Sequence, residues 1–106
     1  MRNLLATILS FLSFTLIASD WPEFRGPNAQ GHAEGLKLPS NISAKSPHLK
    51  WKSAVPGLGW SSPVIVKNRI YLTSAIEKGQ AITLNALCFD ANTGQQLWNA
   101  PIINVA

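Results

Sequence analysis

The chain has 106 residues, which allows one small domain at most. Its nine Lys and Arg outnumber its five Asp and Glu, giving a formal net charge of +4. The basic residues are scattered, whereas nucleic-acid binding needs them clustered on one face, so they are interpreted as solvated surface charges. The single cysteine, Cys88, cannot form an internal disulfide, and its apolar surroundings predict a buried side chain.

The first 18 residues predict a signal peptide. A short positive start at residues 1–3 precedes residues 4–18, which contain no charge and no proline. An uncharged, largely apolar stretch of about fifteen residues suits the hydrophobic region of a secretion signal and is short for a membrane span. We therefore expect an N-terminal signal helix, cleavage after Ala18, and an exported protein, periplasmic or secreted, that keeps no membrane contact. An uncleaved membrane anchor is the alternative.

Residues 19–48 predict an irregular lead segment. Proline, glycine and asparagine recur through it, and neither helical nor strand periodicity survives. We expect it to lie over the surface of the protein, anchored by the large apolar side chains of Trp21, Phe24 and Leu36. Two histidines in this region, His32 and His48, have no Cys or acid at ligand spacing, so we expect them to be exposed and not to bind metal.

From residue 49 the sequence predicts short strands separated by turns. Residues 49–55 alternate apolar and polar side chains, which is typical of a half-buried strand. After a break at 56–59, the pattern predicts a four-stranded antiparallel meander whose last strand is broken or ended near Pro101. In its first turn, Asn68 is best suited to a positive φ. The predicted strands cover residues 63–66, 69–74, 81–89 and 95–103, and the turns cover 67–68, 77–80 and 90–94.

Two of these strands are apolar on both faces. Residues 64–66 and 70–72 show no alternation, whereas a sheet with one face in water would alternate. Trp51 and Trp98 lie 47 residues apart with short strands between them, and a period in the forties with four strands per unit is typical of β-propeller blades. Residues 49–106 are therefore interpreted as a first strand plus about one blade. The remaining blades, or a protein partner, are expected to cover them.

Residues 90–98 resemble the repeat of quinoprotein-like (PQQ-like) β-propellers. Asp90, Thr93, Gly94 and Trp98 fall at the spacing of that family's motif. Asp90 is expected to accept hydrogen bonds from the turn amides, and Gly94 to supply a positive φ. The resemblance implies that Trp98 packs against an adjacent blade; an ordinary hairpin turn followed by a core tryptophan is the alternative. The sequence departs from the usual motif at Cys88, where alanine is usual, and Gln95, where lysine is common.

The resemblance extends into the lead segment. Residues 20–28 with Gly31, and later residues 57–64 and 69–71, are similar to the opening of secreted PQQ-like propeller proteins known mainly from bacteria such as planctomycetes. The similarity covers nearly all of the sequence from residue 20 to residue 98. Proteins of this group are much longer, so the resemblance implies an N-terminal fragment of such a propeller.

The sequence offers no catalytic centre. Quinone binding in the dehydrogenases of this family requires a vicinal cysteine pair, a hard cation such as Ca²⁺ held by oxygen ligands, and a carboxylate base. Cys88 has no neighbouring cysteine, and the five acids are spread along the chain. We therefore expect no cofactor and no enzymatic activity, and interpret the chain as an exported scaffold or protein-binding module. The alternatives are the N-terminal part of a PQQ-dependent quinoprotein oxidoreductase and a truncated gene product without function.

Overall fold

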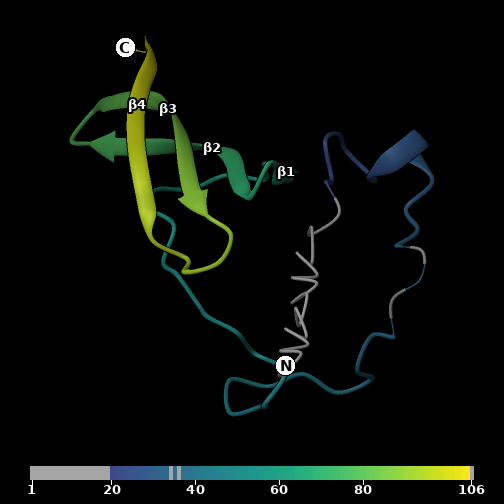
Figure 1. Cartoon of the computed structure of the whole chain (residues 1–106). Helices are drawn as coiled ribbons and strands as arrows, with labels where there is room; N and C mark the ends of the chain where they lie inside the picture. Colours follow the sequence, from purple (N-terminus) through teal and green to yellow (C-terminus); the bar gives the residue numbers. More distant parts are fainter. Residues whose placement is uncertain (1–19, 34, 36, 106) are drawn as a thin grey trace, which may run out of the picture.

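The computed structural model describes residues 20–33, 35 and 37–105, so the expected signal helix and Leu36 lie outside the described residues. Within the described ranges the fold is all-β with almost no helix: one 3₁₀ turn, η1, precedes a single open antiparallel sheet in the order β1-β2-β3-β4 (Figure 1). The predicted four-stranded meander is confirmed. The elements are η1 (Pro27–Ala29), β1 (Val64–Val66), β2 (Arg69–Lys78), β3 (Ala81–Asp90) and β4 (Gln96–Val105).

The β1–β2 hairpin closes through the two residues Lys67 and Asn68. Both have positive φ, 47° and 64°, which is the backbone of a type I′ turn and matches the twist of the flanking strands. The Lys67 amide donates a hydrogen bond of 2.9 Å to the Asp20 carboxylate, tying the lead segment to this turn. The positive φ predicted for Asn68 is confirmed, and Lys67 shares it.

Strand β2 is four residues longer than the sequence predicted. Its pairing with β3 runs without a register shift from Arg69 opposite Asp90 to Lys78 opposite Ala81. The connecting turn is therefore reduced to Gly79 and the residue after it. Glu77 and Lys78, which were predicted to be turn residues, instead continue the ladder because their backbone has a partner on β3.

The break predicted near Pro101 is confirmed, although the strand does not end there, since β4 continues to Val105. The register shifts between Leu84 and Asn85: Leu84 pairs with Ile103, Asn85 pairs with Pro101, and Ile102 is the extra residue. A proline, which has no N–H to donate, is tolerated beside a bulge in an edge strand.

Residues 49–55 do not form the predicted strand. They join no ladder within the described part of the chain, and the side chains of Trp51 and Ser53 instead contact the turn between β3 and β4. Those two side chains are half-buried, while Lys50 and Lys52 are exposed. The alternation that suggested a strand therefore reflects side-chain contacts with one turn.

The lead segment is anchored to the sheet at Trp21. Its N–H and C=O exchange hydrogen bonds of 2.8 Å with Ile65 in β1, and Gly26 packs against its ring. The anchoring role predicted for Trp21 is confirmed, whereas that predicted for Phe24 is wrong, since Phe24 is 68% exposed. The turn closed by the 2.9 Å bond from the Gly26 amide to the Glu23 carbonyl brings Gly26, and not Phe24, to the indole.

The buried apolar core of the described residues lies in the interior strand β3. It consists of Leu87, Cys88 and Phe89, and the predicted burial of Cys88 is confirmed. Apolar side chains of the edge strand β4, including Trp98, Ile102 and Ile103, remain exposed. No helix among the described residues has both the length and the apolar character needed to span a membrane.

Candidate functional site

Three of the residues singled out by the sequence, Asp90, Thr93 and Gly94, lie in the turn from β3 to β4, here called the Asp90 turn (residues 90–94). The fourth, Trp98, lies in β4. The Asp90 carboxylate accepts hydrogen bonds from the amides of Asn92 and Thr93, at 2.8 and 3.0 Å. Gly94 has a φ of 73°, and its amide donates to the Asp90 carbonyl at 2.8 Å. The local chemistry predicted for Asp90 and Gly94 is therefore confirmed.

These hydrogen bonds also change the acidity of Asp90. The amide of Thr93, and next that of Asn92, hold the pKa of the Asp90 carboxyl below its ordinary value, because both stabilise the charged form. The Thr93 hydroxyl and the Arg69 guanidinium act in the same direction. Thr93 further accepts a 3.2 Å hydrogen bond from the Gln95 amide, which extends the network to the start of β4.

The Asp90 turn receives the side chain of Trp51. The indole Nε1 donates a hydrogen bond of 2.9 Å to the Ala91 carbonyl, and the Ser53 hydroxyl donates to the Gly94 carbonyl. A Cβ at position 94 would lie 2.5 Å from the Trp51 ring, so the ring packs directly on the glycine backbone. Lys50 adds a 3.1 Å hydrogen bond to the Asn92 side chain.

Sequence reasoning missed this contact. It assigned Trp51 to a strand, because its alternating neighbours matched strand periodicity. It explained Gly94 by its positive φ alone, while the structure shows that the absence of a side chain also makes room for the indole. The 47-residue interval from Trp51 to Trp98 was the signal that related Trp51 to the motif.

Trp98 has a different environment from Trp51. It lies in β4 opposite Cys88, which in turn lies opposite Tyr71, so the three side chains form one cross-strand row. The Trp98 and Tyr71 rings are 6.1 Å apart between centroids and are tilted by 50°. Trp98 nevertheless stays 42% exposed, so this sheet covers only part of its indole.

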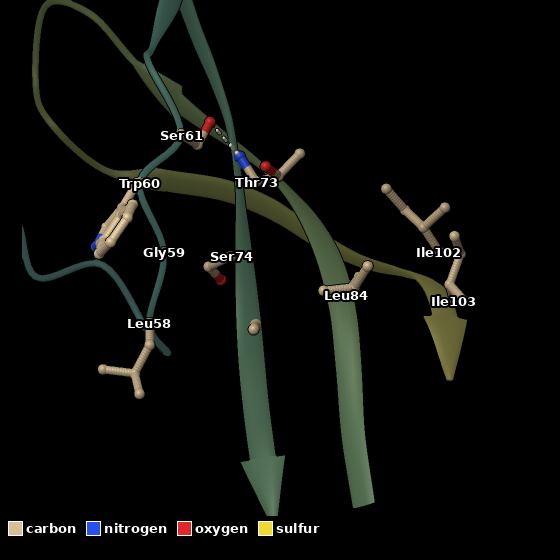
Figure 2. A pocket seen from close by; sticks show the side chains of 10 residues that line it. Leu58, Gly59, Trp60, Ser61, Thr73, Ser74, Leu84, Ile102 and Ile103 are labelled. Atoms are coloured by element: carbon tan, nitrogen blue, oxygen red, sulfur yellow. Dashed lines mark hydrogen bonds between the residues drawn. The ribbon is translucent and has the colours of Figure 1, made fainter. Parts of the chain in front are cut away.

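A second feature is a groove of about 250 Å³ between residues 58–61 and strands β2, β3 and β4 (Figure 2). The backbone of Leu58 pairs with that of Ala75 through hydrogen bonds of 2.8 and 2.7 Å. The Ser61 hydroxyl accepts a 3.1 Å hydrogen bond from the Thr73 amide. These contacts fix the segment along β2, and Trp60 between them is fully exposed.

Two buried polar side chains lie next to each other in the sheet. Ser74 and Asn85 are cross-strand partners, and they are only 5% and 7% exposed. The Asn85 amide nitrogen donates to the Asn99 side chain at 2.6 Å, while Ser74 Oγ and Asn85 Oδ1 have no hydrogen-bond partner among the described residues.

The remaining candidates of the sequence do not converge on a site. His32 and His48 are exposed in the lead segment, as predicted. Within the ranges that the structure describes, no three His, Cys, Asp or Glu side chains are close enough together to hold a metal ion. Comparison with models of protein families, with curated proteins and with solved structures finds no match. The role of Asp90, Thr93, Gly94 and Trp98 as a propeller repeat motif stays a prediction.

Proposed function

We propose that this chain is a structural unit of an exported, quinoprotein-like β-propeller, acting as a scaffold or protein-binding module without a catalytic centre of its own. The observation that carries the proposal is the contact between Trp51 and the Asp90 turn. A tryptophan that precedes the sheet is held by a turn within the sheet through a 2.9 Å hydrogen bond and by packing on Gly94.

The position of Trp98 supports a serial arrangement. Trp98 follows Trp51 by 47 residues, an interval about as long as the segment 64–105 that forms the four-stranded sheet. In an array of such units, each tryptophan would contact the turn of the unit that follows it. Trp51 occupies the turn of this unit, and the 42% of Trp98 that is exposed is available for a turn of the next.

The edges and faces of the sheet support stacking of neighbours on the faces. On the β1 side, Ile65 pairs with Trp21 and Ala75 pairs with Leu58, so that edge is covered. On the other side, β4 has two register shifts and Pro101, features that disfavour pairing with a further strand. The faces, in contrast, expose large apolar side chains such as Leu97 and Trp98, which neighbouring sheets would bury.

A tandem chain tests the proposal. Residues 49–105 are repeated after Val105, so that the first Trp98 can contact the second Asp90 turn, and both chains are melted while circular dichroism is recorded. We expect the single chain to melt over a broad temperature range, and the tandem chain to melt more cooperatively and at a higher temperature, because stability in arrays grows with the number of neighbour contacts.

The matched control is the tandem chain with Trp98→Ala in the first copy only. This variant should lose the higher melting temperature and the added cooperativity of the tandem chain. The proposal is wrong if the single chain is a monomer with a sharp cooperative transition. It is also wrong if the tandem chain melts at the same temperature as the single chain, or if the Trp98→Ala control melts at the same temperature as the tandem chain.

Export is tested separately by producing the chain with a C-terminal epitope in a bacterial host. N-terminal sequencing of the product should begin at Ser19, and the product should leave the cytoplasm. A product that retains Met1 and stays with the membrane fraction would favour the uncleaved anchor, and a cytoplasmic product would contradict export.

A further inference from the structure

We infer that a second copy of this chain covers the groove, with Trp60 of each copy inserted into the groove of the other. The surface concerned, called here the Trp60 patch, consists of Leu58, Trp60, Leu84, Ile102 and Ile103. This inference rests on the groove and its exposed rims, and it does not depend on a propeller.

The patch is an apolar groove between two exposed rims. Figure 2 shows Leu58 and Trp60 on one rim and Ile102 and Ile103 on the other, with β2 and β3 between them. Trp60 is fully exposed, and the other four side chains of the patch are between 38% and 66% exposed. A space of about 250 Å³ is large enough for one bulky side chain, and an indole is the bulky group that the patch itself offers.

Hydrogen bonds to β2 fix the backbone on both sides of Trp60. Its neighbour Leu58 is bonded to the backbone of Ala75, and its neighbour Ser61 is bonded to the Thr73 amide. The segment that presents Trp60 is thus fixed to β2 on both sides of the indole. An anchor presented on a fixed backbone loses little conformational freedom when it binds, which favours association.

Area and symmetry favour a second copy as the occupant. The five side chains leave on the order of 500 Å² of mostly apolar surface on each copy, so a pair buries about 1,000 Å², the lower bound for a specific interface. The patch contains both an anchor and a groove that fits it. In a two-fold pairing each copy supplies one anchor and one groove, so the same contact forms twice without any further partner.

The distribution of charge agrees with self-association at this place. The whole chain carries a net charge of +4, so two copies repel each other wherever their Lys and Arg side chains meet. None of the ten residues that line the groove is charged. The groove therefore lets two copies approach without placing like charges opposite one another.

Sedimentation velocity over a concentration series tests the inference on the full chain. We expect a dimer at micromolar concentration, and Trp60→Ala should raise the dissociation constant by at least about thirtyfold, as for a central aromatic anchor. The matched control is Phe24→Ala, which removes an exposed aromatic ring outside the patch and should leave dimerisation unchanged. All variants share residues 1–19, so association through that stretch would be equal in all of them.

A second pair of variants protects the test against misfolding of the first. Ile103→Lys places a charge in the groove and should abolish the dimer, whereas Val55→Lys, at an exposed apolar residue outside it, should not. The inference is overturned if the natural chain is still a monomer at about 100 micromolar and its circular dichroism does not change with concentration. Association that neither Trp60→Ala nor Ile103→Lys weakens overturns it as well. Either result leaves the tandem-chain experiment interpretable, because its Trp98→Ala control keeps both Trp60 patches and removes only the contact tested there.

Discussion

Trp51 and Trp98 have similar places in the sequence and different places in the structure. Trp51 donates its indole N–H to the Ala91 carbonyl and packs on Gly94, although it belongs to no strand. Trp98 lies within a regular strand, touches Tyr71, and stays 42% exposed. The comparison teaches that contact with the Asp90 turn, and not membership of the sheet, accounts for the better coverage of Trp51.

Gly94→Ala should have the largest effect on this arrangement. A methyl group at this position would clash with the Trp51 ring and would impose a positive φ on a residue with a side chain. We expect the opening free energy of the Leu87 amide, measured by hydrogen exchange, to fall by about 3 kcal/mol. Gly79→Ala is the matched control, since Gly79 has a φ of 63° but no atom within 4 Å of the added Cβ. Equal losses in both variants would show that the close approach of Trp51 is unimportant.

Trp51→Ala should follow, with a loss of about 2 kcal/mol in the same measurement, because a half-buried ring and one hydrogen bond are removed. Trp51→Phe keeps an aromatic ring but loses the N–H bond to Ala91, so it should give a smaller loss. If Trp51→Ala changes exchange no more than Trp60→Ala does in dilute, monomeric protein, the contact in the turn contributes nothing to stability.

Trp98→Ala should cost about 1 kcal/mol or less in the single chain, since the ring is partly exposed and its aromatic neighbour is Tyr71 alone among the described residues. Hydrogen exchange of the Leu87 amide checks this value against that of Trp51→Ala. A loss at Trp98 as large as the loss at Trp51 would contradict the difference between the two sites.

The smallest effect concerns pH at the Asp90 turn. Because the amides of Thr93 and Asn92 lower the pKa of Asp90 below 3.8 in the folded protein, the charged carboxylate contributes stability that is complete above that pH. The contribution is lost as the pH falls through the folded pKa. Asp90→Asn keeps a side-chain acceptor but has no charge, so the advantage of the natural chain over this variant in urea unfolding should shrink below pH 3.8. An advantage that is constant from pH 7 to pH 2.5 would contradict this linkage.

Much of the sheet could be predicted from the sequence because its rules are local. Asn68 marks a two-residue hairpin turn, and Asp90 with Gly94 marks a turn whose hydrogen bonds span at most five residues. Errors arose where a distant partner decides the outcome. β2 is longer than predicted because β3 offers partners as far as Lys78, and β4 extends past the predicted Ile103 because β3 also offers partners to Asn104 and Val105.

The candidate sites divide in the same way. The sequence by itself determined the four strands, the chemistry of the Asp90 turn and the burial of Cys88, since these follow from short apolar runs bounded by turn residues and from residues that are neighbours in the chain. Only the tertiary structure decided that Trp51 covers Gly94 and that Trp60 lies on the rim of a groove. Those outcomes depend on contacts between segments as much as 43 residues apart, from Trp51 to Gly94, which no local pattern specifies.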